Sequence, residues 1–421
     1  SMGCAGNALW MAAVTVSQPV VFLFIAMAAG LTLGANIPVA QDAGAKDWER
    51  LTRVVQTAYV LIGSLAFLFL ALALWQIDAL LQFMRTDPAI YRAAEAYLRV
   101  FLWTIPFSFW TFLVGSVLRG VVDSRTPVYF QAAAVLVNAV LDPLLIFGWL
   151  GLPRLGLVGT AWATLIAQGL GLVGLLAFVA WRRPLAAPDW RRLRIDAKTA
   201  WLLLRIGFPS MVQQSVVSVS MLGIVRAVSQ FGIVADAAFG VGLRIDSVAF
   251  MPAISMGLAA ATLAGQNIGA RCFSRVRQTF GWGLLMSAGI SAVIMLAAIL
   301  FPLSLQRPFV NEPEVLRIGA GYLRIVSLTY VLYAVMFVSN GIINGAGHTI
   351  ITTLISITAL WGIRLPLAGY LASRMQDVTG VWIAMVSSVA VGMVLSLAYY
   401  FSRRWQRPIT NTPRAQIGPV T

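Results

Sequence analysis

The sequence is poor in the side chains that build catalytic and metal centres. Its 421 residues include one histidine, His348, and two cysteines, Cys4 and Cys272. That is too few for a disulfide framework or for a site of clustered Cys and His ligands. Phosphate loops of the form GxxxxGKS or GxxxxGKT are also missing. These shortages argue against a metalloenzyme and an ATP-driven pump, and we expect neither enzymatic activity nor a cofactor.

Charged residues are scarce as well. Only 11% of the chain is charged while 59% is hydrophobic, and the mean hydropathy is +0.84. A soluble domain needs more charge than this to cover its surface. Uncharged blocks long enough to cross a bilayer occur at residues 54–75, 155–181 and 279–306. The composition therefore predicts an all-α polytopic membrane protein.

Acidic residues are outnumbered two to one, with 15 Asp and Glu against 30 Lys and Arg. Such an excess can indicate nucleic-acid binding, but here the basic residues do not form one patch. They recur in alternate loops, for example at 182–198 and 403–407, whereas the intervening loops hold Asp87 and Glu312. This is the pattern of positive charge on the cytoplasmic side. We expect a multi-pass protein of the inner (plasma) membrane, with a cytoplasmic C-terminus and no nucleic-acid partner.

Apolar periodicity predicts eleven spans of the ~20-residue length that a bilayer requires. We expect helices at residues 8–40, 52–80, 90–119, 126–148, 157–181, 199–232, 237–267, 276–305, 314–344, 349–374 and 379–403. The expected division is an N-terminal bundle at 1–182, a polar cytoplasmic linker at 183–198, a C-terminal bundle at 199–404 and a cytoplasmic tail at 405–421.

The two halves repeat at a constant offset of 225 residues. QDAGAKDWERL at Gln41–Leu51 resembles QNIGARCFSRV at Gln266–Val276, and DPAIYRAAEAYLRV at Asp87–Val100 resembles EPEVLRIGAGYLRI at Glu312–Ile325. Both Gln-x-x-Gly-Ala motifs lead into basic cytoplasmic loops, so an even number of spans separates them. The sequence thus predicts two parallel-related bundles around a central cavity, an arrangement found in many transporters.

The offset also predicts an unequal division of the spans. The helix expected at 199–232 opens the second half, and subtracting 225 places its counterpart largely before residue 1. We therefore expect five helices in the first bundle and six in the second, with the first helix of the first bundle lacking.

One apolar run, VLVNAVLDPLLIFGWLG at Val135–Gly151, contains two strongly polar side chains. Asn138 and Asp142 are four residues apart and share one face of a helix. Pro143 cannot donate a hydrogen bond to the Ala139 carbonyl, which adds a third oxygen to that turn. Clustered oxygens suit a proton or a hard cation such as sodium, and ionisable residues within spans indicate function. The alternative is that Asp142 lies near the helix end and reaches the lipid headgroups.

Thr160, in the next span, is predicted to bring a hydroxyl near the same membrane face. The candidate ion site is therefore Asn138, Asp142 and Thr160, with sodium at Asp142 as the one metal considered. In the second half the counterpart of Pro143 is Pro366, and no carboxylate precedes it. An acid needed only for folding would be expected in both halves, so its presence in one half favours a coupling role.

Two further groups are candidates for a cavity lining. Arg226, Arg244 and Asp246 form a possible polar cluster, for which a structural salt-bridge network is the alternative. Apolar or neutral side chains that are candidates for a substrate cavity are Met211, Gln214, Phe250, Met251, Met256 and Tyr330. Such spacing is also typical of plain helix packing.

Three segments carry a family resemblance. They are GLRIDSVAFMPAISMGLAAATLAGQNIGAR at Gly242–Arg271, RGVVDSRTP at Arg119–Pro127 and NAVLDPLLIFGWLGLPRLGLVGTAWAT at Asn138–Thr164. Together they resemble the multidrug and toxic compound extrusion (MATE) family, and the similarity extends over the whole chain. The resemblance implies two six-helix bundles in a V around a central cavity. It also implies export of organic cations coupled to inward movement of protons or sodium ions.

For single residues the resemblance implies less. In many members an Asn and an Asp four apart on helix five, and a Thr on helix six, belong to an ion site in the N-terminal lobe. Asn138, Asp142 and Thr160 match those positions, whereas the site's further carboxylate lies on helix one, which this chain is expected to lack. Some members hold acids on helices seven and ten of the other lobe. This chain has Gln213 and Gln214 on helix seven and no acid on helix ten, so the resemblance predicts no second ion site.

Three function classes fit these observations. The leading hypothesis is secondary active efflux of amphipathic, cationic small molecules by a monomer, with protons or sodium ions as the coupling ion and lipids as the surroundings. The alternative is a flippase for lipid-linked saccharide precursors, whose pyrophosphate requires a markedly basic cavity. Few cationic residues are predicted at that depth, which favours efflux. A non-transporting scaffold or sensor would not need an acid in the first bundle.

Overall fold

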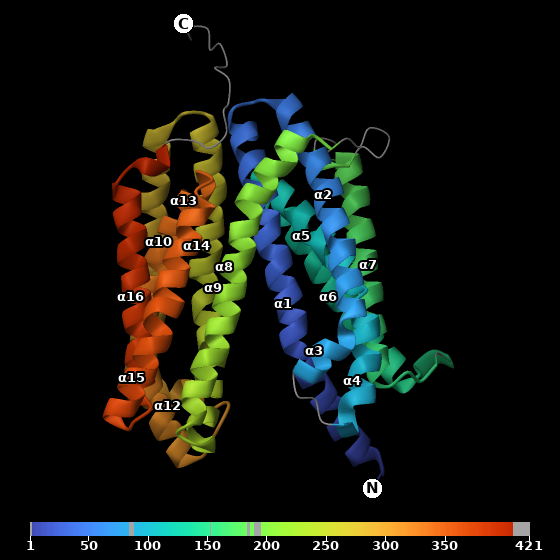
Figure 1. Ribbon diagram of the computed structural model, residues 1–421, viewed down its shortest axis with the longest axis vertical. Coiled ribbons are helices and arrows are strands. Elements are labelled where there is room, and N and C mark those ends of the chain that lie inside the picture. The colour runs from blue at the N-terminus through green and yellow to red at the C-terminus, as the bar shows by residue number, and fades with distance from the viewer. Residues whose placement is uncertain (1, 84–87, 152, 183–185, 189–194, 407–421) are drawn as a thin grey trace, which may run out of the picture. The chain divides into compact units, whose positions relative to one another are not determined.

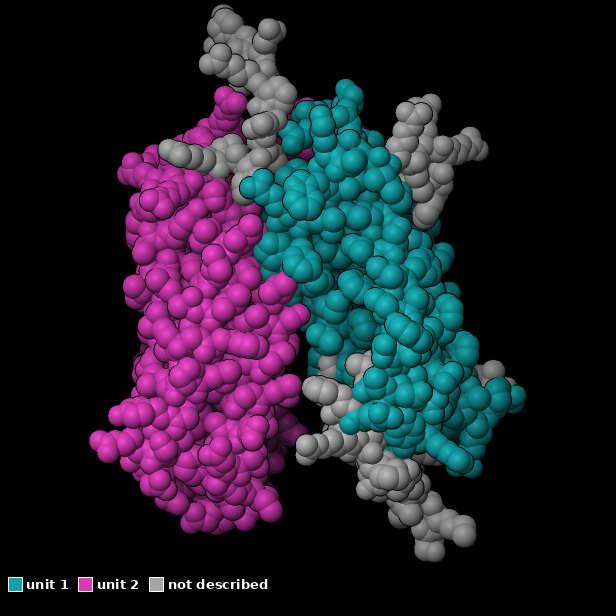
Figure 2. Space-filling model, viewed as in Figure 1, with its two compact units in different colours: residues 1–39, 47–211 teal, residues 40–46, 212–421 magenta. Residues whose placement is uncertain are grey.

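The computed structural model describes residues 2–83, 88–151, 153–182, 186–188 and 195–406, and long helices dominate them (Figure 1). The chain divides into two compact units, which Figure 2 colours separately. Unit 1 comprises residues 1–39 and 47–211, and unit 2 comprises residues 40–46 and 212–421. The predicted linker at 183–198 and tail at 405–421 lie largely outside the described residues.

The helices of unit 1 are connected by short loops. They are α1 (Met2–Gly44), α2 (Trp48–Trp75), α3 (Ile77–Phe83), α4 (Pro88–Phe101), α5 (Thr104–Gly120), α6 (Arg125–Phe147), the 3₁₀ turn η1 (Trp149–Gly151) and α7 (Leu157–Arg182). α8 (Ala197–Ser229) begins in unit 1 and ends in unit 2, and the last turn of α1 also belongs to unit 2.

Unit 2 continues with α9 (Ile233–Gly269), α10 (Phe273–Leu300), α11 (Pro302–Gln306), α12 (Pro313–Val326), α13 (Leu328–Gly345), α14 (Thr349–Ile357), the π-helical segment η3 (Thr358–Arg364), α15 (Leu365–Met375), α16 (Thr379–Phe401) and the 3₁₀ turn η4 (Arg404–Gln406).

Ten helices of the described part are long and apolar enough to cross a membrane. Eleven spans result if α4 and α5, which are bent by 43° at their junction, count as one. Exposed apolar side chains such as Val135, Leu136 and Val140 of α6 suit contact with lipid. The prediction of an all-α polytopic membrane protein with about eleven spans is confirmed.

The predicted repeat is visible in the helix boundaries. α2 and α10 begin and end 225 positions apart, and so do α4 and α12. α1 and α9 end 225 positions apart, at Gly44 and Gly269. When 225 is subtracted from the bounds of α8, the result falls almost wholly before residue 1. Helix boundaries thus carry the same offset as the sequence motifs.

Three predicted helices are interrupted in the structure. The helix predicted at 90–119 consists of α4 and α5, and the one predicted at 314–344 consists of α12 and α13. The helix predicted at 349–374 contains η3, which ends two residues before Pro366. Because proline lacks an N–H, it cannot bond the Gly362 carbonyl, and the π-helical turn occurs where that bond is lost.

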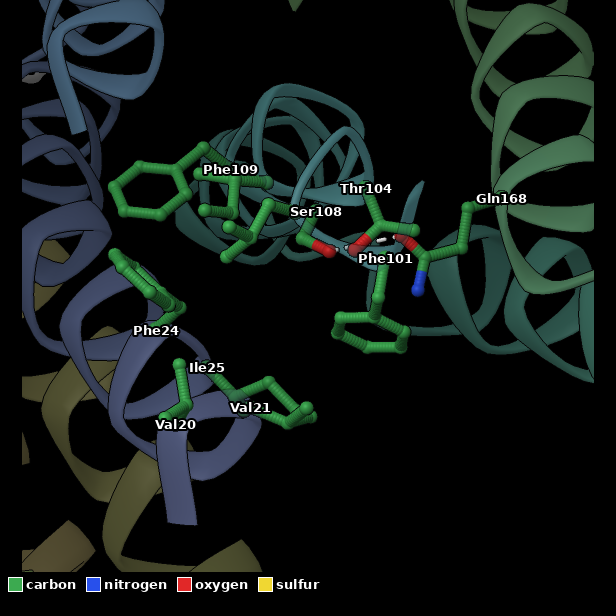
Figure 3. Close-up of a pocket in the computed structure, with 11 residues that line it drawn as sticks. Val20, Val21, Phe24, Ile25, Phe101, Thr104, Ser108, Phe109 and Gln168 are labelled. Carbon is green, nitrogen blue, oxygen red and sulfur yellow. Dashed lines mark hydrogen bonds between the residues drawn. The ribbon is translucent and has the colours of Figure 1, made fainter. Parts of the chain in front are cut away.

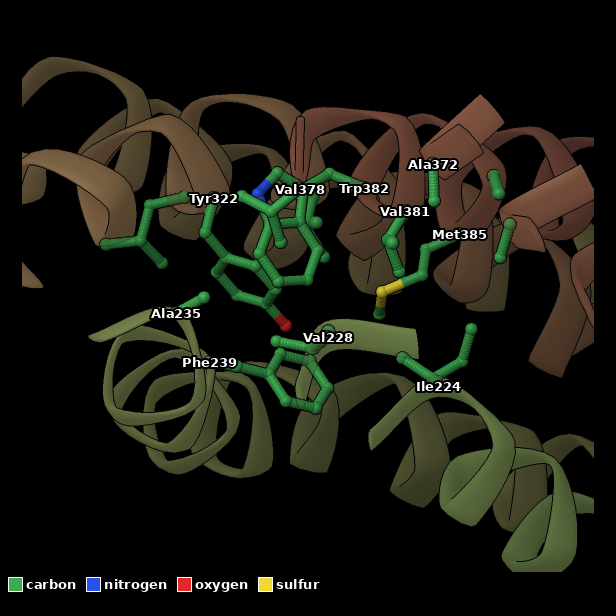
Figure 4. Packing of buried hydrophobic residues seen from close by; sticks show 14 of the residues in the cluster. Ile224, Val228, Ala235, Phe239, Tyr322, Ala372, Val378, Val381, Trp382 and Met385 are labelled. Atoms are coloured by element: carbon green, nitrogen blue, oxygen red, sulfur yellow. The ribbon is translucent and has the colours of Figure 1, made fainter. Parts of the chain in front are cut away.

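Aromatic packing fixes the interior of unit 2 (Figure 4). Phe239 of α9 stacks on Trp382 of α16 with their ring centroids 5.5 Å apart. Tyr322 of α12 meets the same Trp382 edge-on at 4.7 Å. Pairs of this geometry add about 0.5–1.5 kcal/mol each to the burial of the rings. The Tyr322 hydroxyl is therefore held in a defined place inside the unit.

The start of α8 offers a test of local helix stability. The Asp196 carboxylate accepts hydrogen bonds from the hydroxyl and from the backbone N–H of Thr199, the latter at 3.0 Å. These bonds, the hydroxyl bond first, hold the pKa of Asp196 below its usual range. Because the folded pKa is depressed, the stabilisation is present above the unfolded pKa and is lost as the pH falls through the folded value.

We expect Asp196→Ala to lower the free energy of unfolding by about 1 kcal/mol at neutral pH, because the helix start loses its acceptor. Thermal unfolding in detergent, followed by tryptophan fluorescence, measures this loss. Asp196→Asn retains an acceptor oxygen and should keep most of the stability. Equal stability of the alanine variant and the parent would show that this cap contributes nothing.

Candidate functional site

Helix α6 presents two different faces. Val135, Leu136 and Val140 are exposed, whereas Asn138 and Asp142 are only partly exposed and lie on the side that packs within unit 1. Asp142 lies five residues before the end of the helix at Phe147. The carboxylate is thus close to a helix end, as the headgroup alternative requires, but it is turned toward the interior of the unit.

The two polar side chains of α6 contact each other. Asn138 Nδ2 donates a hydrogen bond to Asp142 Oδ2 at 3.0 Å. The other oxygens, Asn138 Oδ1 and Asp142 Oδ1, are buried and accept no hydrogen bond from any described residue. A buried acceptor without a donor costs about 1–3 kcal/mol. A proton or a cation shared by these oxygens would remove that cost, so the arrangement suits ion binding.

Pro143 follows the carboxylate inside α6, and the helix continues to Phe147. Because Pro143 has no N–H, the Ala139 carbonyl receives no bond from it. The turn therefore offers a backbone oxygen beside the two side chains, as the sequence predicted.

Thr160 lies in the first turn of α7, which packs directly on α6. The Leu155 N–H donates to the Leu145 carbonyl at 3.0 Å, and a Cβ on Gly159 would lie 2.7 Å from that same carbonyl. Glycine thus permits the close approach of the two helices. The Thr160 hydroxyl donates to Leu157 O at 2.8 Å, and within the described residues no hydrogen bond joins it to Asn138 or Asp142.

A tyrosine that the sequence reasoning missed faces this site. Tyr97 of α4 is 6% exposed and interacts electrostatically with Asp142. Its ring stacks on Phe101 with centroids 5.6 Å apart. The available signal was the repeat, because Tyr97 and Tyr322 are identical at the offset of 225.

A pocket in unit 1 adjoins this tyrosine (Figure 3). Its walls come from α1, α4, α5 and α7, and they consist of Val20, Val21, Phe24, Ile25, Phe101, Leu102, Thr104, Ile105, Ser108, Phe109 and Gln168. Ser108 Oγ donates to Gln168 Oε1 at 2.8 Å, which gives the apolar pocket one polar corner. Phe101 belongs both to the pocket wall and to the stack on Tyr97.

A polar stripe on α7 also leads from the ion-site end toward the pocket. Thr160, Thr164 and Gln168 are four residues apart and share one helix face. The Thr164 hydroxyl donates to Thr160 O at 2.9 Å. Pocket and candidate ion site therefore lie in the same unit and share α4 and α7.

The predicted cluster of Arg226, Arg244 and Asp246 does not form as predicted. Arg226 and Arg244 are exposed, whereas Asp246 is only 3% exposed. Asp246 instead accepts hydrogen bonds from Tyr322 and Tyr330. The reason is helical geometry, since positions 244 and 246 on α9 point in different directions.

The residues predicted for a substrate cavity also separate. Tyr330 is 1% exposed inside unit 2, and Met256 packs against the apolar core around Phe280 and Tyr400. The remaining four differ in exposure: Met211 and Phe250 are half-buried, and Gln214 and Met251 are exposed. Tyr330 and Met256 thus serve in the packing of unit 2, the alternative role that their spacing allowed.

Comparisons with known proteins agree on one family. A family model described as MatE matches residues 7–144 and 209–369. The probable multidrug resistance protein YoeA of Bacillus subtilis is 31% identical over 93% of this chain and 85% of its own length. The probable multidrug resistance protein NorM of Thermotoga maritima is 26% identical over 96% of this chain and 87% of its own length.

Solved structures agree at the level of the fold. The crystal structure of the Vibrio cholerae MATE transporter VcmN aligns with a TM-score of 0.87 at 21% identity, covering 96% of this chain and 93% of that one. A further structure, described as MATE in complex with MaD5, aligns with a TM-score of 0.86 at 22% identity, covering 95% and 90%.

Proposed function

The chain belongs to the MatE family, and from this membership we propose that it is a secondary active multidrug efflux transporter. It exports amphipathic, cationic small molecules across the plasma membrane in exchange for protons or sodium ions. The relatives described above are named as multidrug resistance proteins, which supports efflux, and nothing among them supports the flippase alternative. The observation that carries ion exchange is the pair of buried oxygens on Asn138 and Asp142 that accept no hydrogen bond from described residues.

Ion exchange at Asp142 follows from the cost of burying a charge. A carboxylate in an apolar unit is stabilised by a bound proton or cation. If ion and substrate favour different conformations of the transporter, each shifts the equilibrium against the other. Tyr97 and Phe101 provide a physical connection, because one faces the carboxylate and the other forms the pocket wall.

The driving force is adequate for this role. One proton crossing 100 mV releases about 2.3 kcal/mol, and one pH unit adds about 1.4 kcal/mol. Together they sustain a gradient of roughly 500-fold for a neutral compound, since about 1.4 kcal/mol corresponds to tenfold. Exchange of one proton for one monovalent cation moves no net charge, so the pH gradient alone drives that case.

The experiment that tests the proposal is dye efflux from vesicles containing the full chain. Ethidium, an aromatic cation, is loaded, and a proton or a sodium gradient is imposed separately. The proposal requires that at least one of the two gradients accelerates ethidium export. Export that responds to neither gradient would refute secondary active transport of this cation.

The pocket of unit 1 gives a second expectation. Phe24→Ala removes an aromatic wall of the pocket and should raise the KM for ethidium about tenfold, with turnover unchanged, because an aromatic contact of about 1.4 kcal/mol is lost. Phe22→Ala is the matched control, since Phe22 lies on the same helix but is 60% exposed and outside the pocket. Concentration series of initial efflux rates separate the two variants, and equal KM values would exclude the pocket as the binding site.

A further inference from the structure

Unit 2 contains a buried carboxylate that the mechanism above does not use. Asp246 of α9 is 3% exposed. The Tyr322 hydroxyl donates to Oδ2, and the Tyr330 hydroxyl donates to Oδ1 at 2.7 Å. Both oxygens therefore accept a bond from a phenol, an arrangement that stabilises the charged form.

Few other charges face this carboxylate. The helices packed on α9 include α10, whose stretch Thr279–Leu300 is uncharged, and α13, which has Tyr333 as a further titratable residue besides Tyr330. The charged residues of neighbouring α8, α9 and α12 are exposed: Arg226, Arg244, Glu314, Arg317 and Arg324. Within the described part of the chain, no ion pair reaches Asp246.

One buried cation lies close by. Arg364, at the end of η3, is 7% exposed and interacts electrostatically with Tyr322. Its guanidinium donates to Ser388 Oγ at 2.9 Å and to Tyr333 Oη at 3.0 Å. Arg364 thus balances the charge of Asp246 through the tyrosines without forming a direct pair, which leaves the carboxylate able to gain or lose a proton.

The repeat supplies independent support. Tyr322 is the counterpart of Tyr97, so the same tyrosine of each half faces a carboxylate, Asp246 in unit 2 and Asp142 in unit 1. The carboxylates themselves are not counterparts, because Asp246 corresponds to Val21 of the unit 1 pocket. A tyrosine kept beside acids of different origin indicates a role connected with the acid.

We propose that Asp246 is a second proton-exchanging carboxylate of this transporter, and that Tyr322 and Tyr330 stabilise its charged form. The family resemblance does not supply this site, since the acids that it places in this lobe lie on other helices. The inference extends the proposed function, and its test needs no transported compound.

The test is labelling by dicyclohexylcarbodiimide, which reacts with protonated carboxyl groups in apolar surroundings. The purified full chain is treated between pH 5 and pH 9, and mass spectrometry of the peptides quantifies the modification of Asp246. We expect about tenfold more labelling at the acidic end than at the alkaline end, following the fraction that is protonated. Labelling of Asp142 in the same sample confirms that the reagent enters the protein.

Variants separate proton exchange from a structural role. Tyr322→Phe and Tyr330→Phe each remove one donor to the charged form, so Asp246 should be labelled more at the alkaline end. Tyr399→Phe is the matched control, because it removes a tyrosine hydroxyl of the same unit that pairs with His348. If Asp246 is labelled equally at every pH, or is unlabelled while Asp142 reacts, the proposal is wrong. Either result leaves efflux through Asp142 standing.

Discussion

Replacing Asp142 with asparagine is expected to reduce gradient-driven ethidium efflux to the level of vesicles that lack the protein. The amide keeps the shape of the side chain and its contact with Asn138, but it can neither take up a proton nor carry a charge. The ion would then bind both conformations equally, and a ligand with equal affinity for two states shifts neither. Initial efflux rates under an imposed proton or sodium gradient measure the loss.

The same helix provides the control. Asp123 caps the other end of α6, where it accepts hydrogen bonds from the backbone N–H and the hydroxyl of Thr126. Asparagine is as good a cap as aspartate, so Asp123→Asn should retain efflux. Both variants should elute as the parent does in size-exclusion chromatography. Full gradient-dependent efflux by Asp142→Asn would mean that the carboxylate only reaches the headgroups.

Substitution of either glycine at the end of α1 or α9 is expected to cause the largest loss of stability. A Cβ on Gly44 would collide with the carbonyl oxygen of Gln266, and a Cβ on Gly269 would collide with that of Gln41. Gln41 Nε2 also donates to the Gly345 carbonyl at 2.8 Å, so these helix ends are fixed in place. We expect Gly44→Val or Gly269→Val to cost about 3 kcal/mol or more, because backbone atoms cannot yield as side chains do.

The yield of monodisperse protein and its thermal midpoint in detergent measure this cost. Gly281→Val is the matched control, since Gly281 is helical but an added Cβ would meet nothing within 4 Å. It should lose only the small difference in helix propensity. Normal yield and midpoint for Gly269→Val would show that this crossing is looser than the structure describes.

Much of the fold was predictable because the repeat left signals in the sequence. The motifs beginning at Gln41 and Gln266 predicted the offset that the boundaries of α2 and α10 later showed. The interruptions were harder to predict. No proline separates α12 from α13, whose junction is at Ser327, and Pro366 marks a π-helical turn as readily as an ordinary kink.

The candidate site was predictable only where its residues are close in sequence. Asn138 and Asp142 are one turn apart, so helical periodicity alone predicted their contact. Tyr322 and Tyr330 lie 76 and 84 residues from Asp246, and only the packing of α12 and α13 on α9 brings them together. The predicted partners Arg226 and Arg244 were closer in sequence, but they point outward on their helices.

The central claim is that Asp142 exchanges an ion for the exported compound, and ion movement tests it most directly. Proteoliposomes containing the full chain are loaded with ethidium and a trapped pH- or sodium-sensitive dye, with no ion gradient imposed. We predict that ethidium leaving the vesicles drives protons or sodium ions inward, and that Asp142→Asn abolishes this counterflow. Ethidium movement with neither ion moving, or counterflow that persists in Asp142→Asn, would contradict the account.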